Sequence, residues 1–264
     1  MEQQNYNKEK LNLLFVILAS FLIGNALLAE LIGSKMFSVN KLLGIPPEGL
    51  SVSGVHFFGF QMNMSIGILM WPLVFILSDL VNEYFGKTGV KRISILAAVL
   101  IAYTSVILLS AAKLPPADFW LNLNNTDPDG NPLNINHAWT MIFRQSVGII
   151  VGSITAFLIG QLIDAYTFHW LRGITGHKAL WLRATGSTIV SQLIDSFVIL
   201  FIAFFILGNW NMKQVFEVGL MQYLYKISFA IILTPLIYLI HFIIDKYLGK
   251  HESEEIIEQT DKNW

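Results

Sequence analysis

The sequence contains no cysteine among its 264 residues, and charged side chains are scarce. Without cysteine the chain can form no disulfide, thiolate zinc site, iron–sulfur cluster or cysteine nucleophile, and its redox compartment stays undecided. Charged residues make up 13% of the chain, against roughly 25% in soluble domains. The formal net charge of −1 excludes a strongly basic nucleic-acid-binding protein. These shortages leave too little polar surface to cover a soluble core.

Apolar residues, in contrast, make up 54% of the chain, and the mean hydropathy is +0.58. A bilayer core about 30 Å thick needs roughly 20 apolar residues of helix to cross it. Six segments have about this length. The sequence therefore predicts an all-α polytopic membrane protein with six transmembrane helices, over residues 11–32, 65–81, 93–112, 141–164, 179–207 and 220–244.

The distribution of Lys and Arg predicts the orientation of these helices. Cytoplasmic loops of membrane proteins carry an excess of positive charge. With the N-terminus inside, eleven Lys and Arg residues fall on the cytoplasmic side and six, including Lys35, Lys213 and Lys226, on the opposite side. We therefore expect both termini to be cytoplasmic.

Two segments outside the spans have a distinct composition. Residues 37–64 alternate turn residues with β-branched and aromatic residues, which predicts a short β-hairpin-like segment on the extracytoplasmic surface after the first helix. Residues 251–264 are acidic, and we expect them to form a solvated, disordered cytoplasmic tail. Residues 1–250 then form a single six-helix transmembrane domain.

Short motifs that suggest an enzyme or a metal site do not fit their context. Residues 85–88 end like a phosphate-binding loop, but Val81 stands in place of the first glycine, and a span precedes the motif instead of a strand. Residues 125–130 resemble the start of a calcium loop, but Asn136 replaces the bidentate glutamate. The six histidines are scattered without paired ligand spacing. We expect no enzyme activity, catalytic residue, metal site or cofactor.

Charged residues also occur inside the predicted spans, where they are costly. A charge at the centre of a membrane helix costs about 2.5–3.5 kcal/mol on insertion scales, so such residues are candidates for function. Asp79 and Glu83 lie four positions apart on one face of the second span, with Asn82 beside them.

The unit Gln-Leu-Ile-Asp occurs twice, at residues 161–164 in the fourth span and at residues 192–195 in the fifth. In each copy Gln and Asp are three apart and share a helical face. The fifth span also carries polar residues at intervals of four, namely Arg183, Ser187, Ser191 and Asp195. Such a stripe is expected to face the bundle interior or a cavity.

Two interpretations of these residues stay open. They could pair to hold helices together, or they could line a solute site between the second, fourth and fifth spans. Glu30 and Lys35, near span ends, fit snorkelling or structural pairing. The predicted binding residues are Asn25, Asp79, Asn82, Glu83, Gln161, Asp164, Arg183, Gln192 and Asp195.

The residues of this region resemble a known family. The run at 71–86 is similar to the central signature of the queuosine precursor transporters, the YhhQ-like group of the vitamin uptake transporters. The similarity continues through residues 114–116, 152–164 and 181–196 and covers about residues 19–205. The doubled Gln-Leu-Ile-Asp unit with Arg183 between its copies is its most specific part.

This resemblance implies a transporter of the cell inner membrane that imports 7-cyano-7-deazaguanine or a related 7-deazaguanine for tRNA modification. It implies as partners this small molecule and the lipid bilayer, and no nucleic acid. A guanine-like edge offers N–H donors to a carboxylate and a carbonyl to an amide or guanidinium. The donor edge would be read by Asp79, Glu83, Asp164 or Asp195, and the acceptor by Gln161, Gln192 or Arg183.

The sequence leaves the source of energy and the oligomeric state, monomer or homodimer, open. An alternative from another class is a substrate-capture subunit that works with a separate energising ATPase complex, because nothing in this chain hydrolyses ATP. Coupling of transport to protons through the carboxylates is a further hypothesis.

Overall fold

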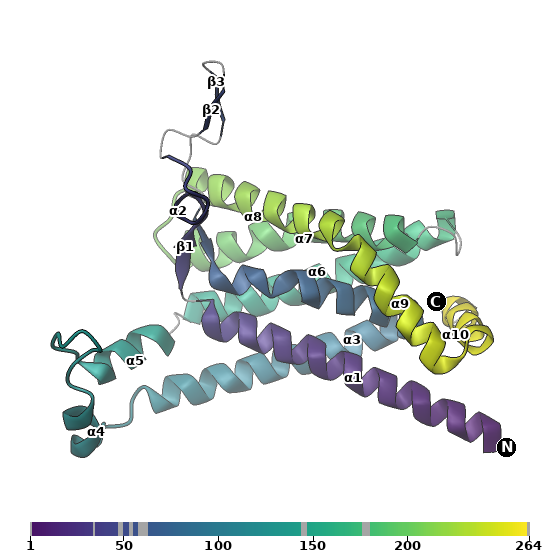
Figure 1. The fold of residues 1–264 in the computed structure, drawn as a ribbon, viewed down its shortest axis with the longest axis horizontal. Helices are drawn as coiled ribbons and strands as arrows, with labels where there is room; N and C mark the ends of the chain where they lie inside the picture. Colours follow the sequence, from purple (N-terminus) through teal and green to yellow (C-terminus); the bar gives the residue numbers. More distant parts are fainter. Residues whose placement is uncertain are drawn as a thin grey trace.

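The computed structural model describes residues 2–33, 35–46, 50–52, 55–57, 63–143, 147–175 and 180–262. Long helices lie side by side, and the N- and C-termini lie at the same end of the bundle (Figure 1). The longest described helices are α1 (Glu2–Ile32), α3 (Trp71–Ala111), α6 (Val147–Thr175), α7 (Leu180–Leu200) and α8 (Met212–Ile232). A π-helical segment, η2 (Phe201–Ile206), continues α7.

In the described part of the chain, five helices are long and apolar enough to cross a membrane. The prediction of a mostly helical, multi-pass membrane protein is confirmed. The expected number of six such helices is not reached, because two predicted spans, 65–81 and 93–112, fall largely within the single helix α3.

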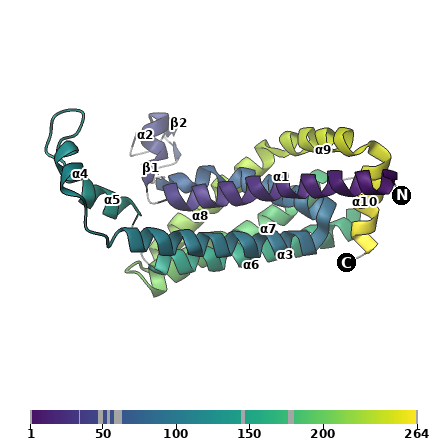
Figure 2. The same cartoon turned by 90° about the horizontal axis from the view of Figure 1, so that it is seen from below.

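Helix α3 is interrupted at Gly86, which has φ 61° and ψ −167°, a backbone conformation essentially restricted to glycine. Both ends of α3 lie at the end of the bundle that faces away from the termini, so the chain turns back at the interruption (Figures 1 and 2). The two segments of α3, before and after Gly86, are therefore antiparallel and correspond to two predicted spans.

The last predicted span, 220–244, is divided between two helices. Helix α8 already begins at Met212 and ends at Ile232, and α9 (Thr234–Leu248) follows. The break precedes Pro235, because proline lacks a backbone N–H and disfavours helical conformation in the residue before it. With 15 residues, α9 is shorter than a typical span.

The segment between α1 and α3 contains strands, as predicted, but in two small antiparallel sheets. Strand β1 (Met36–Ser38) pairs with β4 (Asn63–Ser65), with Met36 opposite Ser65. The second pair is β2 (Leu50–Val52) with β3 (Val55–Phe57). The connecting elements are the short helix α2 (Val39–Leu43) and the 3-10 helix η1 (Ile66–Leu69).

The polar loop after α3 carries the short helices α4 (Asp118–Leu123) and α5 (Ile135–Phe143). Between them, Asp127 Oδ1 accepts hydrogen bonds from the backbone N–H groups of Asn131 at 2.8 Å and Asp129 at 3.0 Å. A hydrogen bond from the Asn131 side-chain amide to Asp127 Oδ2, at 3.0 Å, is the main cause of the lowered pKa of the Asp127 carboxyl group, and the backbone hydrogen bonds add to it. The residues that imitate a calcium loop thus form a tight turn.

The C-terminal segment corrects a prediction. Instead of a disordered tail, residues of this segment form helix α10 (Lys250–Lys262). Ser253, Ile257 and Thr260 recur at helical spacing on one face, and Ser253 and Ile257 are buried. Thr260 donates a hydrogen bond to the carbonyl oxygen of Tyr84 on α3 at 3.1 Å. This small and apolar face docks the acidic helix against the bundle.

The apolar residues are distributed as a membrane protein requires. A core of buried residues, including Leu18, Leu22 and Leu80, joins α1 to α3 and to the helices around them. Large apolar side chains such as Phe21 and Val99 are exposed on the outside of the bundle. This exposed apolar surface suits contact with lipid, and it leaves the interior for the buried polar residues.

Candidate functional site

The predicted binding residues lie at three levels inside the bundle, between α3, α6 and α7. Asp195 lines a large cavity near the end that carries β1 and β4. Glu83 and Arg183 lie toward the opposite end, where α9 and α10 pack. Between them lies a middle level, with Asp79 and Asn82 before Glu83 on α3, Gln192 between Arg183 and Asp195 on α7, and Gln161 and Asp164 on α6, which contact Ser78 and Ser191.

The large cavity has a volume of about 410 Å³. This volume falls in the range of small-molecule sites, roughly 300–1,000 Å³. Its walls come from α1, η1, α3, α5, α6, α7, η2 and α8, with residues of the strands β1 and β4 and of the turns after α1 and η2. Polar and aromatic residues on these walls are Glu30, Ser65, Trp71, Ser153, Asp195, Phe204, Trp210, Gln222 and Lys226. We call this space the outer cavity.

An ion pair crosses the wall of the outer cavity. Lys226 Nζ on α8 lies 2.5 Å from Asp195 Oδ2 on α7. Lys226 is 3% exposed and Asp195 is 6% exposed. The ammonium group also lies 5.8 Å from the centroid of the Trp71 ring. A buried carboxylate, an ammonium and an aromatic ring therefore meet on one wall.

Lys226 was missed by the sequence-based prediction, which placed it among the extracytoplasmic positive charges. It lies instead inside the candidate span α8, with its side chain buried. A signal was present in the sequence, because Lys226 interrupts the apolar run of α8, where a charge is costly. A lone membrane lysine needs a buried partner, and here that partner is Asp195.

Glu30 contributes a second carboxylate to the outer cavity. Ser153 Oγ on α6 donates a hydrogen bond to Glu30 Oε1 on α1 at 2.9 Å. The structure thus places Glu30 in a polar contact between helices, one of the roles expected for it. The rings of Phe204 and Trp210, which also line the cavity, lie with centroids 4.4 Å apart. These rings provide flat apolar surface beside the charged groups.

The first Gln-Leu-Ile-Asp unit connects α6 to both neighbouring helices. Ser78 Oγ on α3 donates to Gln161 Oε1 at 2.7 Å. Ser191 Oγ on α7 donates to Asp164 Oδ1 at 3.1 Å. Gln161 and Asp164 are both buried. The two polar side chains of this unit, three residues apart on α6, thus contact two different helices, α3 and α7.

Several buried polar atoms at the middle level have no hydrogen-bond partner within the described residues. Asp79 is 3% exposed and Asn82 is 1% exposed. The atoms without a partner include Asp79 Oδ1, Asn82 Oδ1, Asn82 Nδ2, Gln192 Oε1 and Ser196 Oγ. Buried polar atoms in native proteins almost always have a partner, so such a group of exceptions requires an explanation.

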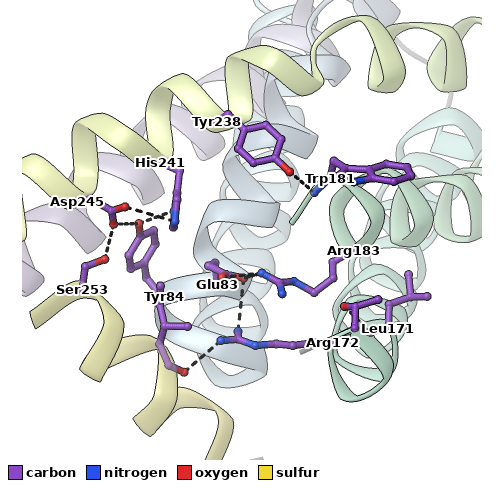
Figure 3. A network of polar contacts seen from close by, with 12 residues as sticks. Glu83, Tyr84, Leu171, Arg172, Trp181, Arg183, Tyr238, His241, Asp245 and Ser253 are labelled. Carbon is purple, nitrogen blue, oxygen red and sulfur yellow. Dashed lines mark hydrogen bonds and ion pairs between the residues drawn. The ribbon is translucent and has the colours of Figure 1, made fainter. Parts of the chain in front are cut away.

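Two arginines converge on Glu83 at the level nearest α9 and α10, which we call the inner level (Figure 3). Arg183 Nη2 on α7 lies 2.8 Å from Glu83 Oε1 and 3.0 Å from Oε2. Arg172 Nη1 on α6 lies 3.5 Å from Oε2. All three side chains are buried, so this triad ties α3, α6 and α7 together.

A second cavity, of about 330 Å³, lies beside this triad and is lined by residues of α3, α9 and α10. On its rim the Tyr84 hydroxyl lies 2.7 Å from His241 Nδ1 and donates to Asp245 Oδ1 at 3.1 Å. Ser253 on α10 donates to the same Asp245 oxygen (Figure 3). The C-terminal helix is therefore connected by hydrogen bonds to the inner end of the bundle.

Asn25 is separate from these groups. Its Nδ2 donates a hydrogen bond to the carbonyl oxygen of Phe21, one turn earlier in α1, at 2.8 Å. This hydrogen bond gives the amide N–H of Asn25 a partner within its own helix. Asn25 does not line the outer cavity.

The chemistry of the outer cavity suits a flat, polar organic solute. Its carboxylates can accept hydrogen bonds, Lys226 can donate them, and the Gln222 amide can do both. In the described part of the chain, no group of three or more His, Cys, Asp or Glu residues is arranged to hold a metal ion.

Comparison with known proteins agrees with this arrangement of polar groups inside a membrane bundle. The family model described as "Putative vitamin uptake transporter" matches residues 65–240. The chain belongs to this family. It is thus a membrane transporter, and its family is not a family of enzymes. The matched region includes every predicted site residue except Asn25.

Curated relatives of this transporter have related names. A "Probable queuosine precursor transporter" of Bacillus subtilis is 27% identical over 188 residues, covering 71% of this chain and 75% of the relative. One with the same name from Haemophilus influenzae is 26% identical over 178 residues, covering 66% of each chain. The "Queuosine precursor transporter" of Escherichia coli is 24% identical over 204 residues, covering 74% and 76%. No solved structure matches this chain.

Proposed function

We propose that this transporter imports a queuosine precursor, 7-cyano-7-deazaguanine or a related 7-deazaguanine, for tRNA modification. The names of the relatives support this substrate class. The observation that carries the proposal is the outer cavity, where the Asp195–Lys226 pair lies beside aromatic rings. A cavity of about 410 Å³ has room for a bicyclic base and a few waters.

The chemistry of a guanine-like base matches this wall. Its ring N–H and exocyclic amine form a donor edge, which the Asp195 carboxylate can accept. Its carbonyl oxygen can accept a hydrogen bond from the Lys226 ammonium or the Gln222 amide. The ring of Trp71 offers a face for stacking. Among the predicted residues, we therefore assign Asp195 to substrate binding in the conformation that the structure has.

The other predicted residues lie deeper, toward the end of the bundle that carries both termini. We assign Asp79, Asp164 and Gln192 at the middle level and Glu83 and Arg183 at the inner level to the route that the substrate follows. The Glu83–Arg183–Arg172 triad closes this route, because its three side chains are buried against one another. In the structure the outer cavity lies on one side of the closed triad, and the second cavity, of about 330 Å³, lies on the side of α9 and α10.

We propose a topology with six crossings of the inner membrane and with both termini in the cytoplasm. Gly86 divides α3, so that residues 71–85 cross in one direction and residues 87–111 in the other. The first of these segments spans roughly 22 Å at 1.5 Å per residue. The 3-10 helix η1 extends it by roughly 8 Å, to the thickness of a bilayer core. Helices α8 and α9 together make the last crossing.

The absence of cysteine permits a direct test of this topology. Single cysteines at Asn124, in the loop between α4 and α5, and at Glu255, on the exposed face of α10, report on opposite sides. A membrane-impermeant maleimide should label Asn124→Cys in intact cells and Glu255→Cys only after permeabilisation. Labelling of both, or of Glu255→Cys alone, in intact cells contradicts the proposed orientation.

The function is tested by uptake into liposomes that contain only the purified transporter. We expect uptake of radiolabelled 7-cyano-7-deazaguanine, and its loss in Asp195→Asn. The matched control is Glu217→Gln, the same change at an exposed carboxylate of α8. Binding without uptake would favour the alternative of a capture subunit with a separate ATPase. Full uptake by Asp195→Asn would contradict the site.

A further inference from the structure

Two neighbouring carboxylates at the middle level are not balanced by a positive charge. Asp79 on α3 and Asp164 on α6 are both buried, and the two helices are joined beside them by the hydrogen bond from Ser78 to Gln161. Asp164 Oδ1 accepts a hydrogen bond from the Ser191 hydroxyl, while Asp79 Oδ1 has no partner within the described residues. Neither carboxylate forms an ion pair with a cation in the part of the chain that the structure describes.

The cationic groups on the helices around this pair have other contacts. Arg172 on α6 and Arg183 on α7 contact Glu83. Lys226 on α8 contacts Asp195. Lys87, on the second segment of α3, lies 3.5 Å from the centroid of the Tyr166 ring. These four cations are thus placed against other groups, and Lys91 and Arg92, further along α3, are exposed.

The titratable groups on the remaining helices add no positive charge at the pair. On α9, His241 contacts the Tyr84 hydroxyl, and Asp245 accepts a hydrogen bond from it. Of the lysines, Lys10 on α1 donates a hydrogen bond to the Tyr247 carbonyl oxygen, and Lys246 on α9 is exposed. The other groups on the packed helices are Glu30 on α1, which accepts a hydrogen bond from Ser153, His169 on α6, which has contacts of its own, and Glu254 and Glu258 on α10, which line the second cavity.

A buried carboxylate without a counter-ion is very unfavourable in a medium of low dielectric constant. Two such carboxylates side by side are worse, because they also repel each other. The pair must therefore hold at least one positive charge when the bundle is closed. The chain supplies that charge from none of its described residues, so a proton or a metal cation from solution has to supply it.

The surroundings of Asp79 offer both oxygen ligands and space. Asn82 lies three residues from Asp79, on the same face of α3, and its Oδ1 has no partner within the described residues. A small cavity of about 10 Å³ touches Asp79, Thr185 and Thr188 on the side of α7, α8 and α9, and Asp164 and Asn82 do not line it. This volume is close to the roughly 10–15 Å³ that a cavity needs to hold one water. Carboxylate, amide and hydroxyl oxygens are the ligands that hard cations prefer.

We propose that Asp79 and Asp164, with the amide oxygen of Asn82, bind one monovalent cation, a proton or Na⁺, that is coupled to transport. The ion enters from the side of the outer cavity and leaves to the cytoplasm, and no covalent bond of the substrate changes. Cation binding is independent of the proposed substrate, whereas the coupling rests on the proposed function.

Cation binding is tested first on the purified transporter without substrate. Infrared titration of the carboxyl C=O stretch, from about pH 5 to about pH 8, detects a proton that the pair takes up. The melting temperature in NaCl, compared with choline chloride, detects Na⁺. We expect one of these signals in the wild type and its loss in Asp79→Asn and in Asp164→Asn. The matched control, Glu217→Gln, should keep it.

The two amide variants also distinguish a cation site from a purely structural role. Each removes one negative charge and keeps the shape of the side chain, so the variant without a cation carries the same net charge as the wild-type pair that holds one. We therefore expect Asp79→Asn to fold and to melt, in the absence of Na⁺ and at high pH, at or above the wild-type temperature. The proposal is overturned if the wild type gives neither a carboxyl titration nor a Na⁺ shift.

Coupling is tested by uptake of 7-cyano-7-deazaguanine into liposomes under an imposed pH or Na⁺ gradient. The gradient of the bound ion should accelerate uptake by the wild type and leave uptake by Asp79→Asn unaffected. An uptake rate that changes with neither gradient overturns the proposed coupling. Cation binding that depends on Asp79 while no deazaguanine moves contradicts the proposed substrate and leaves the cation site in place.

Discussion

The ammonium of Lys226 on α8 lies 2.5 Å from a carboxylate oxygen of Asp195 on α7, and both residues line the outer cavity. The pair joins two helices at the proposed substrate site. A buried ion pair is weak evidence for stability, but loss of one partner leaves a buried charge alone. The pair can thus exchange its mutual contact for contacts with a polar solute.

Removing only the positive charge should destabilise the bundle. In Lys226→Met, Asp195 becomes an unpaired buried carboxylate, and breaking a buried pair from one side costs about 3–5 kcal/mol. We expect a lower melting temperature in detergent and loss of uptake. Addition of Asp195→Asn to Lys226→Met should restore most of the stability but not the uptake, because the site then lacks both charges.

The matched control for this prediction is Lys213→Met on the same helix. Lys213 is exposed and lies 3.8 Å from Glu217, a surface pair worth about 0–1 kcal/mol. We expect little change in melting temperature. Equal melting of Lys213→Met and Lys226→Met would show that the buried pair makes no special contribution.

The two arginines of the inner triad should contribute unequally. Arg183 Nη2 is within 3.0 Å of both oxygens of Glu83, whereas Arg172 Nη1 is 3.5 Å from one of them. Lysine cannot reproduce the planar donor geometry of arginine. We therefore expect Arg183→Lys to lower the melting temperature more than Arg172→Lys. The opposite order in thermal unfolding would contradict the observed arrangement.

The reversal of α3 depends on a glycine. Gly86 has φ 61° and ψ −167°, and a side chain in such a region costs about 1–3 kcal/mol. Gly86→Ala should therefore destabilise the protein. Gly24→Ala on α1 is the control, because an added Cβ there meets no atom within 4 Å. In a helix this change stabilises by roughly 0.5–1 kcal/mol, so the same substitution should shift the two melting temperatures in opposite directions.

Docking of α10 should depend on one apolar contact. Ile257 is buried, and the carbonyl oxygen of Ile257 accepts a hydrogen bond from Arg172 Nη2 at 3.2 Å. An isolated helix of this length is marginal in water, so an undocked α10 should unfold. We expect Ile257→Asp to raise amide hydrogen exchange throughout Lys250–Lys262. Glu255→Ala, at an exposed position, should leave exchange unchanged; equal protection in both variants would contradict docking.

Much of the candidate site could be predicted from spacing along single helices. Asp79 and Glu83 do share a helix, and Gln161, Asp164 and Arg183 are buried as expected. Side chains three or four residues apart on a helix lie on one face, and that geometry is local. Membrane hydropathy is local as well, and the multi-pass helical class follows from it.

Other features could not be predicted because they arise from contacts between distant segments. Lys226 pairs with Asp195, 31 residues earlier in the chain. The acidic segment of α10 is helical because its Ser253–Ile257 face packs on α3 and α9, and its composition alone favours disorder. Which residues of α3, α6 and α7 meet at each level, such as Ser78 with Gln161 and Asp164 with Ser191, depends on how the three helices pack.

The sequence by itself determined that this protein spans a membrane repeatedly and that costly polar residues lie within its helices. Both conclusions depend on residue type and on helical spacing. Only the tertiary structure decided which polar groups share a cavity, which have a counter-ion and where the chain turns back. The physical reason is that electrostatic balance and cavity volume belong to several packed helices at once.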